Sequence, residues 1–328
     1  MPPRWQRRLP PYERPVSEAP AEGTAQTLLR PAIVIPFTLT ALIWGATWFA
    51  IKDQLHAAPP SWSVTWRFIV AAIGMGVLVL ARRQSFRMSR EGHVVAALFG
   101  LTQFCLNFNL LYRAEAYLTS GIVAVMFAML MLPNALLGRV FLGIRVSGRF
   151  VAGTAVALAG IGLLLLHEAR VASLAGGLAG GAVVTGIALA CASILAASAA
   201  NVMQAGQVAR RQPILAMLFW ALLWGALGDF CVAWVLSGPP VLPLSARYVA
   251  SVLYLGIMGS VVTFPLYFSL IRALGPGRAA YNGVVVPIVA MLISTLAEGY
   301  RWSLLSVAGA VLALLGMVLA LRARSPSR

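Results

Sequence analysis

The chain carries little charge and few acidic side chains. Only 10% of its 328 residues are Asp, Glu, Lys or Arg, nine of them acidic, whereas 60% are hydrophobic. In soluble globular domains about a quarter of the residues are charged, so this composition excludes an ordinary soluble domain. Apolar runs of roughly 17 to 25 residues fill the chain instead, the length that an α-helix needs to cross a hydrocarbon core of about 30 Å. The sequence therefore predicts an all-α polytopic membrane protein.

Ten transmembrane helices are predicted, with prolines and glycines marking several of the connections. Their expected bounds are 33–52, 61–81, 93–112, 119–141, 150–167, 181–204, 213–236, 247–270, 279–297 and 303–321. Residues 1–32 are rich in Pro, Arg and Glu, which predicts a disordered N-terminal tail. Residues 322–328 form a short basic C-terminal tail.

The net charge of +16 comes from basic residues spread over short connections, not from one basic face. The two tails and the even-numbered connections hold 19 of the 25 Lys and Arg residues, whereas the odd-numbered connections hold 5. Because positive residues collect on the cytoplasmic side of membrane proteins, both termini are predicted to be cytoplasmic. The excess charge is thus a topology signal, and no nucleic-acid partner is expected.

The sequence also lacks the motifs of several common chemistries. There is no G-x-x-x-x-G-K-[ST] loop for ATP, no H-E-x-x-H and no Cys-x-x-Cys pair, and the three cysteines share no metal-ligand spacing. We therefore expect that the chain is not an enzyme and needs neither a cofactor nor a metal.

The two halves of the chain resemble each other. The segment AGTAVALAG (Ala152 to Gly160) closes the first half and AGAVLALLG (Ala308 to Gly316) the second, and Pro133 and Pro287 precede them at similar distances. Two five-helix repeats, 33–167 and 181–321, joined by a glycine-rich linker at 168–180, are therefore predicted. An odd number of helices makes the second repeat enter the membrane from the opposite side. Inverted repeats of this kind are typical of transporters that work by alternating access.

Several blocks resemble a known family. LIWGATWFAIK, WRFIVAA, LTSGIVAVMFAMLMLP and ALGPGRAAYNGVVVPIVAMLISTLAEG are similar to the repeated blocks of EamA-type members of the drug/metabolite transporter superfamily. The resemblance covers about residues 38–321 and implies ten helices in two inverted repeats, with export of amino acids or other small metabolites. The glutamate that usually follows the proline block is present as Glu298, but the equivalent position in the first repeat is Ile144.

One stripe on the first predicted helix combines aromatic rings with the only lysine. Trp44, Trp48 and Lys52 are spaced i, i+4, i+8 and therefore share a face. Either Lys52 snorkels to the interface above packed tryptophans, or the stripe lines a cavity in which the rings and the ammonium group contact the substrate. Arg67, in the second helix, costs about 2.5 to 3.5 kcal/mol to bury, so it faces a cavity, snorkels, or pairs with an acid such as Asp53. If both line a cavity, the two cations Lys52 and Arg67 near its outer end favour an anionic or zwitterionic substrate.

Asp229 is the only acid expected well inside a span. An isolated carboxylate there tends to be protonated or paired, so Asp229 is a candidate for proton coupling or for a structural hydrogen bond. Glu298 and Arg301, at the outer end of the ninth helix, predict a structural ion pair.

Neutral polar residues and prolines complete the candidate site. Substrate binding or interhelical hydrogen bonding is expected of Gln103, Asn107, Tyr267, Tyr281 and Asn282. Prolines within spans loosen helices for gating or simply kink them, and the spans contain Pro133, Pro265 and Pro287.

Together these features predict a secondary transporter that exports amino acids or other small polar metabolites across a bacterial inner membrane. Its partners would be a small-molecule substrate and the lipid bilayer. Two alternatives remain open: a translocase of lipid-linked or phosphorylated carriers on the same fold, and a non-coupled channel or receptor.

Overall fold

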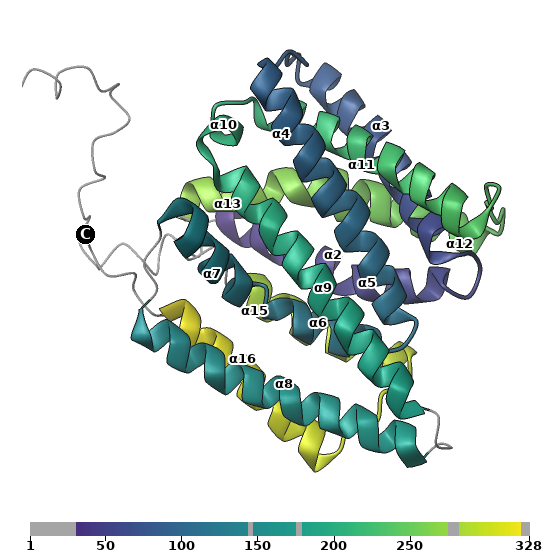
Figure 1. Cartoon of the computed structure of the whole chain (residues 1–328), viewed down its shortest axis with the longest axis vertical. Helices are drawn as coiled ribbons and strands as arrows, with labels where there is room; N and C mark the ends of the chain where they lie inside the picture. Colours follow the sequence, from purple (N-terminus) through teal and green to yellow (C-terminus); the bar gives the residue numbers. More distant parts are fainter. Residues whose placement is uncertain (1–30, 144–146, 175–178, 275–281, 323–328) are drawn as a thin grey trace, which may run out of the picture.

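The computed structural model describes residues 31–143, 147–174, 179–274 and 282–322, and all regular structure within these ranges is helical (Figure 1). Eight helical segments are long and apolar enough to cross a membrane, so the chain is a multi-span membrane protein. They are Pro31–Gln54, Pro60–Ala81, Arg90–Glu115, Ser120–Phe141, Gly148–His167, Gly181–Ala205, Ile214–Ser237 and Ala246–Tyr267. Two shorter apolar helices, Asn282–Ala297 and Leu304–Ala320, follow them.

Most of these segments are single α-helices. They are α2 (Pro31–Gln54), α3 (Pro60–Ala81), α8 (Gly148–Leu174), α9 (Ala179–Ala205), α11 (Ile214–Ser237), α15 (Asn282–Ala297) and α16 (Leu304–Arg322), with a short helix α10 (Gln207–Arg210) before α11. The fourth span is broken into α6 (Ser120–Ala128) and α7 (Met131–Leu142) by a turn at residues 129–130, just before Pro133. We call the end of the bundle at which α2 ends, after Lys52, the Lys52 end.

The third and the eighth spans each contain a π-helix in the middle. The third consists of α4 (Arg90–Gly100), the π-helix η4 (Leu101–Asn107) and α5 (Phe108–Glu115), and the eighth of α12 (Ala246–Leu253), the π-helix η5 (Tyr254–Val262) and α13 (Thr263–Leu274). Pro265 follows η5 closely and has no N–H to donate to the preceding turn, so a wider turn there accommodates the proline. Pro287, by contrast, lies inside α15.

Several predicted boundaries differ from the structure or lie outside the described residues. The α8 helix continues to Leu174, so part of the predicted linker at 168–180 is helical, because the sequence remains rich in Ala, Val and Leu until the glycines begin. The third span ends at Glu115 instead of residue 112, and the ninth helix is described only from Asn282. Most of the two predicted tails, residues 1–30 and 323–328, lies outside the described residues.

The helix contacts come in matched pairs. α2 packs on α15 and α13, and its counterpart five spans later, α9, packs on α7 and α5. In the same way α3 packs on η5, and α11 packs on η4. Three further contacts, α3 with α11, α6 with α15, and α8 with α16, each join a long apolar segment to the apolar segment five places later.

Glycines bring α8 and α16 into close contact, and these helices lie side by side along one edge of the molecule (Figure 1). Gly153 faces Gly316, and Gly160 faces Gly309. A Cβ atom added at any of these four positions would collide with backbone atoms of the opposite helix. Ascending numbers in α8 meet descending numbers in α16, so the two similar Ala-Gly segments pack antiparallel, backbone against backbone.

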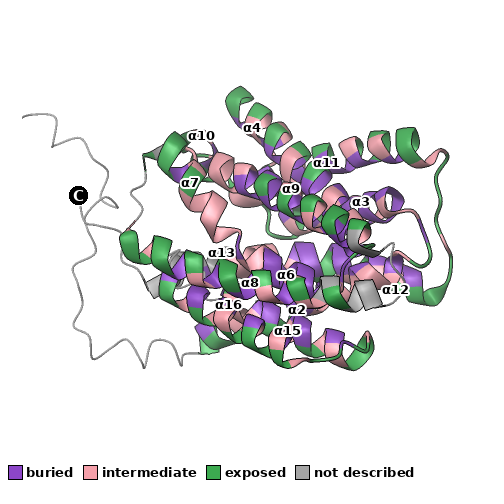
Figure 2. Ribbon diagram, turned by 60° about the horizontal axis from the view of Figure 1, so that its bottom comes forward, coloured by how far each residue is buried: buried purple, intermediate pink, exposed green. Residues whose placement is uncertain are grey.

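Buried positions lie on the inner sides of the helices, and exposed positions follow the outer surface (Figure 2). Many of the exposed side chains are large and apolar, as at Val140, Val235 and Leu304. An apolar outer surface of this extent suits contact with lipid.

Replacing Gly160 with alanine should destabilise the protein, because the added Cβ would collide with the backbone of Ala313. Overpacking of this kind typically costs about 1–3 kcal/mol, so the variant should unfold at a lower temperature in detergent. Gly162→Ala on the same helix is the matched control, because no described atom lies within 4 Å of a Cβ there. Equal unfolding temperatures of the two variants would contradict the close packing of α8 on α16.

Candidate functional site

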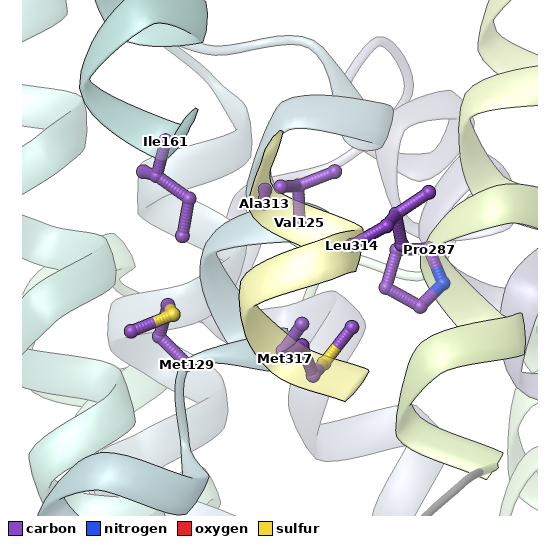
Figure 3. A pocket seen from close by; sticks show the side chains of 8 residues that line it. Val125, Met129, Ile161, Pro287, Ala313, Leu314 and Met317 are labelled. Atoms are coloured by element: carbon purple, nitrogen blue, oxygen red, sulfur yellow. The ribbon is translucent and has the colours of Figure 1, made fainter. Parts of the chain in front are cut away.

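An apolar crevice lies between α6, α8, α15 and α16 (Figure 3). Its lining side chains are Val125, Ala128, Met129, Ile161, Pro287, Ala313, Leu314 and Met317. These groups neither donate hydrogen bonds nor carry charge, so the crevice does not suit a charged or polar substrate. The buried charged side chains lie elsewhere in the bundle.

Arg67 of α3 is a buried cation, with 3% of its surface exposed. Its guanidinium carbon lies 4.4 Å from the centre of the Phe108 ring and 5.1 Å from that of Phe68. Among the described residues, its Nε and Nη1 atoms have no hydrogen-bond partner. The two rings attract the cation through their faces, but the N–H groups of Nε and Nη1 remain available.

The surroundings of Arg67 come from both halves of the chain. Tyr112, on α5, is fully buried and interacts electrostatically with the guanidinium group, as do Tyr254 of η5 and Asp229 of α11. A Cβ atom on Gly259 of η5 would lie 3.7 Å from Arg67 Nη2. Arg67 therefore faces the interior between the two halves. The interpretation in which it snorkels to the interface is wrong.

Asp229 is completely buried, as expected of an acid inside a span. Its Oδ1 atom accepts a hydrogen bond of 2.7 Å from Asn109 Nδ2, and its Oδ2 atom has no partner within the described part of the chain. Asn109 also donates to the carbonyl oxygen of Cys105, at 3.0 Å. The structural hydrogen bond that the sequence allowed is thus present, and one carboxyl oxygen remains unpartnered.

The two tryptophans of the stripe face the interior but contact different helices. Trp44 Nε1 donates to the carbonyl oxygen of Gly259 at 3.2 Å, and the Trp44 ring lies 5.1 Å from that of Tyr267. The Trp48 ring lies 5.1 Å from that of Phe127, and its Nε1 atom has no described partner. The stripe therefore lies between α13 on one side and α6 on the other.

Lys52 binds backbone carbonyl groups. Its ammonium group donates to the carbonyl oxygens of Glu115 and Leu118, the latter at 2.9 Å. These carbonyls stand at the C-terminus of α5, where a cation is favourable. Lys52, which is half-buried, thus binds the end of α5, whose last residue, Glu115, is completely buried.

Glu298 has other partners than the one predicted. Its Oε2 atom accepts hydrogen bonds from Ser120 N, at 3.2 Å, and from Ser294 Oγ, at 2.7 Å. No ion pair with Arg301 forms in the described part of the chain, and Arg301 is exposed. The backbone N–H groups at the N-terminus of α6 attract the carboxylate, while Gly299, with φ of +70°, turns the chain away.

Asp53 also has a different partner from the one considered. Its carboxylate binds Arg247 twice, through Nε at 2.9 Å and through Nη2. This pair joins the end of α2 to the start of α12 beside an open depression that His56 helps to line. Asp53 is therefore not a partner of Arg67.

Two of the neutral polar candidates, Asn107 and Asn282, form hydrogen bonds between helices. Asn107 Oδ1 accepts from Ser193 Oγ of α9 at 2.7 Å, and Asn282 Nδ2 donates to Thr40 Oγ1 of α2 at 2.8 Å. Gln103 Oε1 has no partner among the described residues. Tyr281 lies outside the residues that the structure describes.

Comparison with known proteins identifies the family. The model of the EamA-like transporter family matches residues 32–166 and 184–322. The chain belongs to this family. The resemblance of the sequence blocks is thereby confirmed, and two separate matches cover both halves of this EamA-like transporter.

Two of the following three relatives of this EamA-like transporter are named as a transporter or an efflux pump. Protein PagO of Salmonella typhimurium is 23% identical over 90% of this chain and 94% of its own length. A probable amino-acid metabolite efflux pump of Escherichia coli is 22% identical over 85% and 91%. The uncharacterized inner membrane transporter YedA of Escherichia coli is 29% identical over 77% and 79%. A solved crystal structure, 21% identical, shares the fold with a TM-score of 0.63 over 87% of this chain and 95% of the other.

Removing the side chain of Asn109 should destabilise this EamA-like transporter, because the Oδ1 atom of Asp229 would lose its donor. An unsatisfied buried acceptor costs about 1–3 kcal/mol. In a double-mutant cycle, Asn109→Ala should cost much less once Asp229→Ala is present. Denaturation in mixed micelles measures both effects, with Asn134→Ala as control because its contact to Asn201 is long, at 3.4 Å. Additive effects of the two substitutions would show that the hydrogen bond contributes nothing.

Proposed function

We propose that this chain is a secondary transporter that exports amino acids or other small polar metabolites across the bacterial inner membrane by alternating access. In this proposal ten helices, the eight long spans with α15 and α16, form two inverted five-helix repeats. Both termini are cytoplasmic, and the Lys52 end of the bundle faces the outside. The names of two relatives, an amino-acid metabolite efflux pump and an inner membrane transporter, support the substrate class and the location.

The observation that carries the proposal is the guanidinium group of Arg67. It lies 97% buried between the two halves, beside aromatic rings, with its Nε and Nη1 atoms unpartnered by any described residue. A guanidinium group presents its donors in a fork that matches a carboxylate. Arg67 is therefore suited to bind the carboxylate of a small substrate, while Phe108 and Trp44 offer ring surfaces to its apolar part.

Alternating access is supported by the symmetry of the contacts. Spans five places apart make equivalent contacts, and α8 packs antiparallel on α16 through equivalent glycines. In inverted repeats, the two halves can exchange conformations, which exposes a central site first to one side and then to the other. The site around Arg67 lies where α3 of the first repeat meets η5 and α11 of the second.

Substitution of Arg67 should weaken transport. In proteoliposomes loaded with single amino acids or related carboxylic acids, wild type should show saturable counterflow. Arg67→Gln should lower kcat/KM, because a charge-assisted hydrogen bond of about 1.5–3 kcal/mol is lost, which equals roughly ten- to hundredfold. Arg67→Lys should be nearly as impaired, since an ammonium group lacks the planar fork.

The matched control is Arg149→Gln, because Arg149 is an exposed arginine on α8. Equal kcat/KM for Arg67→Gln and wild type would show that Arg67 does not bind substrate. If no compound of the panel exchanges through folded wild-type protein, the amino-acid assignment falls.

The proposed topology predicts which connections a membrane-impermeant maleimide reaches. In a variant whose three cysteines are replaced, a cysteine at His56, exposed at the Lys52 end, should react in intact spheroplasts. A cysteine at Ser85, exposed in the connection between α3 and α4, should react only after the membrane is permeabilised. The opposite pattern of labelling would place the termini outside.

A further inference from the structure

Glu115, the last residue of α5, is a completely buried acid that none of the sequence motifs includes. Both of its carboxyl oxygens lack a hydrogen-bond partner among the described residues. Asp229, the other completely buried acid in the described ranges, has one oxygen satisfied by Asn109. Glu115 is therefore the less satisfied of the two carboxyl groups.

The charged and titratable groups that face Glu115 come from four elements. Lys52 of α2, Arg67 of α3, and Glu298 after α15 interact with it electrostatically, as does Tyr112 of its own helix. None of them donates a hydrogen bond to its carboxyl group. Lys52 donates to backbone carbonyl groups instead, and Glu298 is itself an acid that binds the N-terminus of α6.

An ionised carboxylate without donors is far more costly to bury than a neutral carboxylic acid. The cations Lys52 and Arg67 reduce that cost and the second acid, Glu298, adds to it, but burial is the largest effect. The conformation in which Glu115 is sealed from water is therefore compatible with a neutral carboxyl group, whereas a conformation that admits water at this position favours the carboxylate.

We propose that Glu115 is a proton-binding site of the transport cycle: its carboxyl group carries a proton while the Lys52 end is closed, and releases it when that end opens to water. On opening, the O–H bond breaks, the proton passes to water, and the carboxylate that remains faces the ammonium group of Lys52. On closure, a proton returns from water to the carboxylate. The inference rests on the proposed function, because it assigns the coupling ion to a transporter.

The position of Glu115 links this proton to the opening of the bundle. Glu115 is the last residue of α5. Lys52 holds the turn after α5 in place, because it donates hydrogen bonds to the carbonyl oxygens of Glu115 and Leu118. Lys52, Glu115, Leu118 and Ser120 belong to the first repeat, and Glu298 of the second repeat joins them through its contact with Ser120. Separation of the two repeats at this end would break that contact and expose the carboxyl group.

Infrared spectroscopy tests protonation without any substrate. Wild type labelled with carbon-13 in glutamate, reconstituted in lipid at neutral pH, should show a protonated-carboxyl band that shifts with the label, which excludes Asp229 as its source. The band should be lost in Glu115→Gln and kept in Glu91→Gln, a control at an exposed position of α4. Absence of a label-sensitive band in wild type, its persistence in Glu115→Gln, or its loss in Glu298→Gln alone would overturn the proposal. Glu115→Asp offers a second variant if Glu115→Gln does not fold.

Flux measurements test the coupling. A pH gradient should drive accumulation of an exchanged compound in wild type, and in Glu115→Gln this accumulation should be lost while counterflow continues, because the amide imitates the protonated acid but cannot release a proton. Accumulation that still follows the pH gradient in Glu115→Gln would overturn the proposal and leave the transport function intact. If wild type exchanges no compound, the proposed function fails, and the infrared result still decides the protonation of Glu115.

Discussion

The cost of placing charge inside a lipid-embedded bundle governs this structure. Water is not available in the hydrocarbon core to solvate a guanidinium group, so Arg67 depends on what the helices supply. They supply two ring faces and, through space, the acids Asp229 and Glu115. None of these groups satisfies the Nε and Nη1 atoms of Arg67, which is why the proposed function assigns substrate binding to this residue.

Glycine makes the close approach of the two halves possible. On η5, Gly256 leaves room for Val70 of α3 and Gly259 for Thr47 of α2, so that the backbone of the second half comes close to Arg67. On the periphery, Gly153 and Gly160 of α8 and Gly309 and Gly316 of α16 each meet the backbone of the opposite helix, which allows a close antiparallel pair. Glycine thus allows close helix packing both at the edge of the molecule and around Arg67.

Whether a feature of this structure can be predicted from the sequence depends on how far apart in the chain the interacting residues lie. The helices follow from runs of apolar residues, and the stripe of Trp44, Trp48 and Lys52 from periodicity along one helix. Contacts between helices cannot be read from the sequence in this way. The hydrogen bond between Asp229 and Asn109, for example, joins residues 120 positions apart and depends on the register of two helices. The burial of Glu115 is not evident from the sequence for a local reason. The apolar run predicts a helix end at residue 112, and three further residues extend the helix and bury the acid.

The two buried acids differ in what holds them, and this difference separates their roles. Asp229 lies within α11, which packs along η4, and its bond to Asn109 ties those two spans together at a depth far from any connection. Glu115 lies at a helix end, next to a contact between repeats that consists of Glu298 and the first backbone N–H of α6. A carboxyl group fixed between packed spans keeps its surroundings, so the bond from Asn109 to Asp229 suits a structural role. In the proposed rocking motion, a carboxyl group at the junction of the repeats would change its exposure, which is the property that a coupling site requires.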